Sequence, residues 1–255
     1  MSQPVLLRGD CHDLIKTLPD NSVDLILTDP PYGTTAAKWD KKLDYTQLWV
    51  EYERVLKPTG VCLIFSAQPF TSMLIASNPK YYRNIWYWRK NRKTGFLRTG
   101  QQPMRCIEEI CVFGRTPESA TYNPQMRLRE KPVVRNRLRK AGKLYKPTPA
   151  ERWVKGEVED RVYTHYHPDH LLEFDAVPHK DTPVETQKPV DLLRYLIRTY
   201  SNPGELVLDP TMGAGSTSVA ALEEGRAFVG FEFSAKHYDI AVQRIEGDEL
   251  RLAAE

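Results

Sequence analysis

The 255-residue chain contains few cysteines and no long hydrophobic segment. Its four cysteines, at positions 11, 62, 106 and 111, form no Cys-x-x-Cys pair or other zinc-ligand spacing. We therefore expect free thiols in a reducing compartment and no metal site. No apolar run approaches the roughly 20 residues that a membrane-spanning helix needs. The N-terminal residues lack a signal-peptide pattern, so we expect a cytoplasmic protein with no membrane partner.

Basic residues are unevenly distributed, although the net charge is only +3. Between Arg83 and Lys146 the chain holds 17 basic and four acidic residues, a net charge of +13, so the rest carries −10. A run of charge is most often a solvated face. Segregation this strong on an otherwise acidic protein is better explained by a polyanionic partner.

A short apolar run ends in a proline turn, Asp29-Pro30-Pro31-Tyr32. Residues 23–28 suit a buried strand, which must end by Asp29 because prolines lack the N–H that a sheet ladder needs. Each proline fixes its own φ and favours extended backbone before it, so Asp29 and Tyr32 project from a preset turn. One segment then offers a carboxylate, a backbone acceptor and an aromatic face.

A second segment combines a strand end, a tight loop and a helix start. Residues 206–209 read as a buried strand, and Gly213 and Gly215 lie in the loop before a helix at Ser216, which is a geometry that brings backbone close to a ligand. A Gly-x-Gly pattern alone is weak evidence. The next strand, however, ends at Glu232, whose carboxylate is placed to hold both hydroxyls of a ribose. No third glycine follows at the spacing of a dinucleotide fingerprint, so no pyrophosphate is needed.

The hydrophobic periodicity predicts an α/β fold, because strands alternate with helices in a way that indicates a parallel sheet covered on both faces. The predicted strands are residues 5–7, 23–28, 61–65, 83–88, 107–113, 206–209 and 227–231, and the predicted helices are residues 11–18, 45–56, 70–76, 189–198, 216–224 and 235–246. From about residue 116 to 182 the periodicity lapses. His165, His167 and His170 lie in that stretch, where a hydrogen-bonded loop is favoured over a metal site.

The two segments resemble the motifs of the β-class DNA amino-methyltransferases, which transfer a methyl group from S-adenosylmethionine to adenine N6 or cytosine N4. In that family, as here, the catalytic motif precedes the cofactor motif. The resemblance covers roughly residues 5–113 and 180–246. It implies a circularly permuted Rossmann-like methyltransferase sheet with an inserted basic target-recognition region. The implied parts are a catalytic half at 1–115, the inserted region at 116–182 and a cofactor-binding half at 183–255.

The resemblance also implies roles for matching residues. The catalytic motif is Asp29, Pro30, Pro31 and Tyr32. The implied cofactor-binding residues are Asp10, Cys11, Asp29, Thr186, Lys188, Pro189, Asp209, Gly213, Gly215 and Glu232. Thr211 departs from the pattern, because the family usually has Phe in that wall of the cofactor pocket.

The chemistry requires an aromatic amine to become a nucleophile. If its hydrogens bond to the Asp29 carboxylate and the Pro30 carbonyl, the nitrogen moves towards tetrahedral geometry and its lone pair towards the methyl donor. Such a fixed group is typically worth about 3 kcal/mol as positive charge develops. No covalent enzyme intermediate is needed.

The target base must leave the duplex and be sandwiched in the pocket, with Tyr32 on one face and Trp88, or less favourably Trp86, on the other. Burial in a strand core is the alternative for both tryptophans. The loop from Thr34 to Lys42 is a candidate lid over double-stranded DNA. The candidate DNA-binding residues are Lys38, Trp39, Trp88, Arg89, Lys90, Arg135, Arg137 and Arg139.

Adenine N6 is the favoured acceptor, because the motif begins with Asp29 whereas the cytosine-N4 members of the family more often have Ser there. A cytosine-N4 enzyme stays open, as does a methyltransferase of RNA or of a protein amide. A non-catalytic nucleic-acid-binding partner of the same fold is the alternative from another class, and the intact motifs disfavour it. The resemblance also raises the expectation of a homodimer.

Overall fold

The computed structural model describes residues 3–33, 43–115, 120–135, 161–178 and 187–252. The chain folds into two compact units. The larger unit contains Met1–Asn123 and Asp169–Glu255, and the smaller unit contains Pro124–Pro168. The functional boundaries at residues 115/116 and 182/183 stay a prediction. Within the described residues, no helix has the length and apolar character to cross a bilayer.

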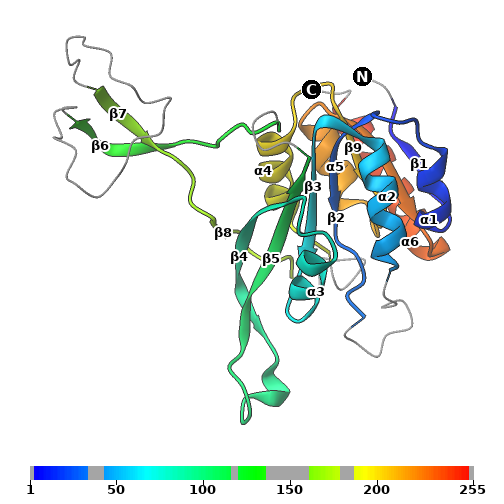
Figure 1. Ribbon diagram of the computed structural model, residues 1–255, viewed down its shortest axis with the longest axis horizontal. Coiled ribbons are helices and arrows are strands. Elements are labelled where there is room, and N and C mark those ends of the chain that lie inside the picture. The colour runs from blue at the N-terminus through cyan, green and yellow to red at the C-terminus, as the bar shows by residue number, and fades with distance from the viewer. Residues whose placement is uncertain (1–2, 34–42, 116–119, 136–160, 179–186, 253–255) are drawn as a thin grey trace. The chain divides into compact units, whose positions relative to one another are not determined.

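An eight-stranded sheet forms the centre of the larger unit, in the order β1-β10-β9-β2-β3-β5-β4-β8 (Figure 1). The strands are β1 Val5–Arg8, β2 Val23–Thr28, β3 Leu56–Ser66, β4 Tyr82–Thr94, β5 Arg105–Gly114, β8 Leu171–Glu173, β9 Leu206–Asp209 and β10 Ala227–Glu232. The first five in the spatial order pair in parallel, and β5 is antiparallel to both of its neighbours. The predicted α/β class is confirmed, although the sheet is mixed rather than wholly parallel.

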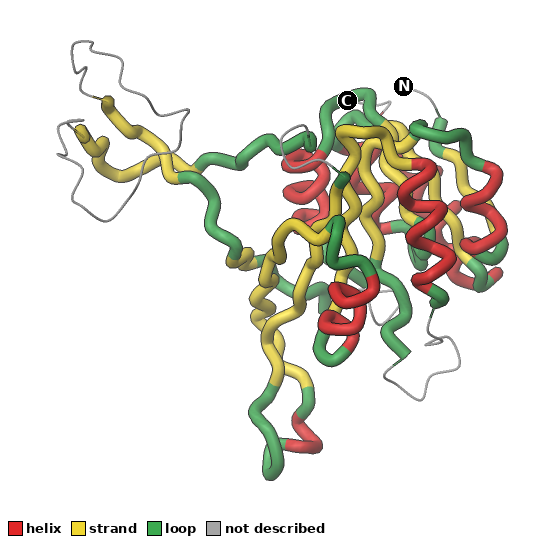
Figure 2. Tube along the Cα trace, viewed as in Figure 1, coloured by secondary structure: helices red, strands yellow, loops and turns green. Residues whose placement is uncertain are grey.

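Helices cover both faces of this sheet (Figure 2). One hydrophobic cluster joins α4, α5 and α6 to the sheet, and the other joins α1, α2 and α3 to its opposite face. Consecutive residues of β2 alternate between the clusters, as the two-residue period of a strand requires: Leu25 and Leu27 face the first and Ile26 the second. The helices are α1 Cys11–Leu14, α2 Tyr45–Val55, α3 Phe70–Ser77, α4 Val190–Tyr200, α5 Ser216–Glu223 and α6 Ala235–Leu252, and short 3-10 helices are η1 Ile15–Thr17 and η2 Phe96–Arg98.

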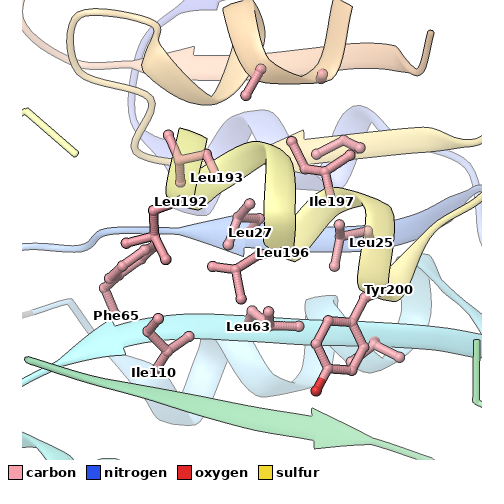
Figure 3. Close-up of a cluster of buried hydrophobic side chains, with 14 of the residues drawn as sticks. Leu25, Leu27, Leu63, Phe65, Ile110, Leu192, Leu193, Leu196, Ile197 and Tyr200 are labelled. Atoms are coloured by element: carbon pink, nitrogen blue, oxygen red, sulfur yellow. The ribbon is translucent and has the colours of Figure 1, made fainter. Parts of the chain in front are cut away.

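Helix α4 packs its apolar face over the middle of the sheet. Figure 3 shows Leu192, Leu196 and Ile197 above β2 and β3, and each of these side chains is fully buried. Pro189 is the N-cap of α4, where its lack of an N–H costs nothing. The burial therefore fixes the start of α4, and with it Lys188, beside the carboxyl end of β2.

The two ends of the chain combine in the sheet. β1 pairs with β10 through Leu7 and Phe231, and β9 lies between β10 and β2 with Ile26 opposite Leu208. The C-terminal strands thus lie between the first and second strands of the chain, as the permuted order requires. Circular permutation as the origin of this arrangement stays a prediction.

The prediction of an irregular middle segment is wrong in part. The smaller unit contains an antiparallel ribbon of β6 Arg127–Arg135 and β7 Arg161–Tyr166, and β8 follows it in the larger unit. His165 lies in β7 rather than in a loop. None of the ribbon's residues with described exposure is buried, so it has no buried face to impose an alternating hydrophobic pattern on the sequence. Strand β3 also begins earlier than predicted, at Leu56.

Candidate active site

Three acidic residues lie at one edge of the sheet. Asp29 follows the last residue of β2, Asp209 is the last residue of β9, and Glu232 is the last residue of β10. These strands run in parallel, so their carboxyl ends meet at the same edge. Ligands of open α/β sheets bind at this edge. The two sequence segments that predicted a catalytic turn and a cofactor loop are therefore neighbours in space.

The glycine loop between β9 and α5 has left-handed backbone at Gly213, with φ of +54°, and at Gly215, with φ of +76°. A Cβ on Gly213 would meet no atom within 4 Å, so its backbone is open on that side. A Cβ on Gly215 would lie 3.0 Å from the Ala241 side chain of α6. Gly213 therefore offers open backbone to a ligand, whereas Gly215 allows close helix packing.

Glu232 secures this loop from the neighbouring strand. Its Oε2 accepts a hydrogen bond from the Gly213 N–H at 2.9 Å, and its Oε1 accepts one from the Ser234 N–H at 2.7 Å. An ionised carboxylate has about four acceptor positions, so two remain for ligand hydroxyls. Phe233, the next residue, is 79% exposed and offers an aromatic face beside that carboxylate.

Asp209 stabilises the glycine loop through hydrogen bonds. It is buried and accepts hydrogen bonds from the Thr217 hydroxyl at 2.6 Å and from the Thr211 N–H at 3.1 Å. Burial raises the pKa of Asp209 to about 7, against the lowering effect of these hydrogen bonds. Thr211 in turn is joined to Thr28 of β2 through their hydroxyls, 2.6 Å apart. The residue that departs from the family pattern thus ties the loop to the catalytic strand.

Asp29 is held from two sides. The Tyr32 hydroxyl donates to Oδ1 at 2.9 Å, and the Lys188 ammonium forms an ion pair with Oδ2. Burial raises the pKa of Asp29, and Lys188 opposes this shift without cancelling it. The same neighbourhood raises the pKa of Lys188, because its attraction to Asp29 and Glu108 outweighs the cost of burial. The turn therefore presents an oriented carboxylate whose ionised form needs the adjacent cation.

Glu108 of β5 is a site residue that the sequence reasoning missed. Its Oε2 lies 3.5 Å from the Lys188 ammonium, and its Oε1 accepts from Lys90 of β4 at 2.6 Å. Burial alone would raise the pKa of Glu108, but Lys188 and Lys90 lower it below its usual range. A buried chain of alternating charges, Lys90-Glu108-Lys188-Asp29, thus leads from the antiparallel strands to the catalytic turn.

An aromatic group supports the turn on its other side. The Tyr32 ring stacks on Phe70 of α3, with centroids 5.1 Å apart and an angle of 18° between the ring planes. Phe70 also contacts Tyr45, the first residue of α2. The Tyr32 hydroxyl stays protonated, because burial and the nearby carboxylates raise its pKa well above its ordinary value. One face of Tyr32 is therefore fixed by protein packing.

The catalytic turn and the glycine loop line one pocket that is partly open to solvent. Gln187 also lines it, and the side-chain oxygen of Gln187 is buried without a hydrogen-bond partner among the described residues. The pocket residues are Asp29, Phe65, Gln187, Lys188, Leu193, Asp209, Thr211, Met212, Gly213, Ala214, Ser216 and Thr217.

Asp10 and Cys11 lie at the carboxyl end of β1. Asp10 caps α1 by accepting from the His12 N–H at 2.9 Å, and it also bonds the His12 ring. Cys11 is buried, and burial raises its pKa to about 12. The Gly9 N–H donates to the Glu232 carbonyl at 3.0 Å, which places this turn next to the end of β10. Neither residue lines the pocket in this structure, so their role in cofactor binding stays a prediction.

Two predicted DNA-contacting residues are placed differently. Trp88 is only 2% exposed and donates from Nε1 to the Phe174 carbonyl at 2.8 Å, so here it belongs to the core and offers no face to a base. Lys90 is largely buried against Glu108. At this point β4 is paired with β5 on one side and β8 on the other, and the residue pattern of β4 did not reveal this. Arg89 is more than half exposed and pairs with Glu173.

The remaining predicted residues lie at the limits of the described chain. Lys38, Trp39, Thr186, Arg137 and Arg139 lie outside the described residues. Arg135 is the last residue of β6, and its side chain is not described. Their predicted roles stay predictions.

A family model of DNA methylases, named for N6 and N4 methylation, matches residues 23–243. This range includes both the catalytic turn and the glycine loop. The chain belongs to this DNA methylase family. The family predicted from the two motifs is confirmed, and S-adenosylmethionine is the methyl donor of that family.

Curated relatives of this DNA methylase match it over most of their own length. The type II methyltransferase M.HpaI of Haemophilus parainfluenzae is 29% identical, covering 95% of this chain and 74% of the relative. The DNA adenine methyltransferase YhdJ of Escherichia coli K12 is 26% identical over 94% of this chain and 82% of the relative.

Solved structures share the fold of this methylase. A complex of M1.HpyAVI with S-adenosylmethionine superposes with a TM-score of 0.64 at 21% identity, covering 95% of this chain and 99% of the other. The cytosine-N4-specific PvuII DNA methyltransferase superposes with a TM-score of 0.65 at 15% identity, covering 98% and 93%. At these identities the likeness extends to the fold alone.

Proposed function

We propose that this DNA methylase transfers the methyl group of S-adenosylmethionine to N6 of an adenine flipped out of double-stranded DNA. The observation that carries the proposal is the single pocket that joins Asp29 of the catalytic turn to Gly213 of the glycine loop. Methyl donor and acceptor amine can meet in that pocket, which supplies the positioning that transfer between two substrates requires.

The residues of the loop fit the donor. Glu232 has unused acceptor positions for ribose hydroxyls, and Phe233 offers an exposed ring for an adenine. Lys188 is placed to meet a carboxylate such as that of the methionine part. The open backbone of Gly213 lines the same pocket as Lys188 and donates its N–H to Glu232. S-adenosylmethionine supplies an electrophilic methyl group on a positively charged sulfur.

The catalytic turn prepares the acceptor. We infer that the Asp29 carboxylate and the Pro30 carbonyl accept hydrogen bonds from the two N–H groups of the amine, which turns the nitrogen lone pair towards the donor. As the N–CH3 bond forms, the S–CH3 bond of the donor breaks, and the methylated nitrogen then releases one proton. Tyr32 and Lys188 already bond to Asp29, yet a carboxylate has acceptor capacity for a further partner. Asp29 must be ionised to do this, so activity should fall as the pH is lowered towards its raised pKa.

Methylation of an amine needs no protein nucleophile, and the cysteines agree with that chemistry. Burial raises the pKa of the Cys11 thiol to about 12 and that of Cys111 to about 11. A nucleophilic cysteine requires a lowered pKa. No cysteine lines the pocket among the described residues. Transfer to an exocyclic amine is therefore favoured over a route that forms a covalent bond to a cytosine ring.

Tyr32 supports a flipped base. Phe70 stacks on one face of its ring, and Tyr32 as a whole is only partly buried, which supports stacking of a base on the other face. Adenine is favoured over cytosine by Asp29 at the head of the motif and by the adenine-specific relative in Escherichia coli. A non-catalytic binding partner is not favoured, because the motif residues are intact.

The deciding experiment identifies the methylated nucleoside. The protein is incubated with isotope-labelled S-adenosylmethionine and unmethylated duplex DNA, which is then digested for mass spectrometry. We expect labelled N6-methyladenine, and none with the Asp29→Ala control. N4-methylcytosine as the sole product would refute the adenine assignment. No methylated nucleoside across varied DNA and RNA would contradict the proposed function and revive the binding-partner alternative.

A further inference from the structure

The hairpin of β4 and β5 continues beyond the sheet. β3 accompanies β5 only as far as Glu109, and β8 accompanies β4 only as far as Arg89. Residues 91–105, which we call the hairpin tip, therefore pair with no described strand outside the hairpin itself. Figure 1 shows this part of the hairpin extending past the other strands of the sheet. A two-stranded ribbon alone is marginally stable, so this extension adds little to the fold.

The hairpin tip presents apolar side chains to solvent. Every residue from 91 to 100 is exposed, including Phe96 at 73% and Leu97 at 98% in the short helix η2. Gly95 begins this turn with φ of +90°, a backbone conformation that suits glycine. Single exposed apolar residues are ordinary. Two adjacent ones at the end of a projecting ribbon form a small apolar surface without a partner in the described chain.

Positive charge surrounds that apolar surface. From Arg89 to Arg105 the sequence has six basic residues and no acidic residue. Arg89 and Lys90 are in ion pairs at the base of the hairpin. The other four cations are exposed and have no acidic partner among the described residues; they are Arg92, Lys93, Arg98 and Arg105.

The hairpin leaves the sheet at the active-site edge. β4 runs in the same direction as β3, because both are antiparallel to β5, so its carboxyl end lies with that of the catalytic strand β2. Lys90, at the base of the hairpin, is connected to Asp29 by ion pairs through Glu108 and Lys188. Phe96 lies six positions after Lys90, a reach of about 20 Å at about 3.3 Å per residue. Along a duplex this is up to about six base pairs at 3.4 Å each.

We propose that the hairpin tip is a DNA-binding element that grips the duplex several base pairs from the flipped base. Its arginine and lysine side chains contact phosphates, and Phe96 and Leu97 pack against base edges or sugars in a groove. The reach of about 20 Å places the tip away from the gap that the flipped base leaves. This inference rests on the proposed function, because it takes duplex DNA as the substrate at the site edge.

The charge favours DNA over a second copy of this chain as the occupant. The cores of protein interfaces are depleted in charged residues, whereas interfaces with DNA are strongly positive. Four cations with no acidic partner in the described part of the chain, around two apolar residues, fit the second pattern. The other occupant is nevertheless an outcome of the test.

The test separates the apolar and the charged parts. Phe96→Ser with Leu97→Ser removes the apolar surface, and its matched control is Val50→Ser, an exposed residue of α2. Arg92→Ala, Lys93→Ala and Arg98→Ala together remove charge, and Lys80→Ala, an exposed lysine before β4, is the control. All substituted side chains are exposed, so the variants should keep the melting temperature of the parent protein.

Binding is measured by fluorescence anisotropy with a labelled duplex of unmethylated DNA, across a range of salt concentrations. We expect the apolar double variant to weaken DNA binding about tenfold and to raise KM for DNA more than it lowers kcat. The charge variant should lower the slope of log K against log salt by about 2 to 3. Affinity for S-adenosylmethionine should be unchanged in both variants.

The outcomes distinguish the two proposals. If the parent protein methylates DNA and the hairpin variants match it in DNA affinity and KM, the hairpin proposal is wrong and the proposed function stands. If the parent protein yields no methylated nucleoside, the proposed function itself fails. If the variants change the sedimentation mass but leave DNA affinity intact, the hairpin tip joins two copies of the chain and the proposal is overturned.

Discussion

Apolar side chains are buried in the sheet of the larger unit but exposed in the ribbon of the smaller unit. All six residues of β2 are buried, and both faces of the sheet carry an apolar cluster. In the ribbon, Leu128 is 75% exposed, Val134 55% and Val162 57%. A two-stranded ribbon with no buried face is marginally stable alone. The sheet therefore holds the site residues within a packed core, while the ribbon leaves apolar side chains exposed.

The ribbon is held by polar and aromatic contacts instead of a core. The Arg129 guanidinium lies 3.7 Å from the centre of the Tyr166 ring and donates to the His165 carbonyl at 3.0 Å. Contacts of this kind at exposed positions are each worth about 1 kcal/mol or less. This comparison predicts that substitutions at the active-site edge of the sheet change chemistry or cofactor binding, whereas substitutions in the basic segment that contains Arg135, Arg137 and Arg139 change DNA affinity.

The largest expected effect belongs to Asp29. Asp29→Ala should lower kcat about 100-fold or more, because a fixed group that stabilises developing charge is lost. Cofactor binding, measured by calorimetry, should persist. Asp191→Ala is the matched control, since its carboxylate is 80% exposed on α4. Loss of cofactor affinity equal to the loss of kcat would mean that Asp29 acts through binding instead.

Glu232 tests the cofactor loop. Glu232→Ala should weaken S-adenosylmethionine binding by about 1 to 3 kcal/mol, the cost of leaving hydroxyl groups and the Gly213 N–H without their acceptor. Calorimetry measures this, with exposed Glu246 of α6 replaced by Ala as the control. Unchanged cofactor affinity in Glu232→Ala would remove Glu232 from the site.

Substitutions in the basic segment should change the salt dependence of DNA binding rather than kcat. Replacing Arg135, Arg137 and Arg139 together by Ala should lower the slope of log K for DNA against log salt by about 2 to 3, if each contacts a phosphate. Anisotropy titrations at several salt concentrations check it. The control removes exposed lysines of the larger unit, Lys16, Lys80 and Lys236. An unchanged slope would show that the segment is only a solvated charged surface.

The smallest expected effect is that of Asp209→Asn, which should change how the stability of the fold depends on pH. Burial raises its pKa from 3.8 to about 7. Between these values the unfolded chain releases a proton that the folded protein keeps, so the contribution to stability falls as pH rises and is constant above about 7. Asp209→Asn lacks this titration, so its stability relative to the parent should improve from about pH 5 to pH 7. Urea unfolding measures it, and a pH-independent difference would contradict the shift.

The sequence by itself determined the local structures that create the site. Prolines after residue 29 end β2 at Thr28, as predicted, because they cannot extend a ladder. The glycines at 213 and 215 have the left-handed backbone that the tight loop needs. Each of these features depends on neighbours along the chain, so residue types and spacing were sufficient to predict it.

Only the tertiary structure decided which distant residues join these segments. Glu108 lies 79 residues after Asp29 and 80 before Lys188 in sequence, and nothing in its own segment marks it as part of the site. The sequence favours Trp88 as a base-stacking residue, yet the position of β4 between β5 and β8 places it in the core. Strand order and register arise from packing across the whole sheet, so such contacts are absent from any local pattern.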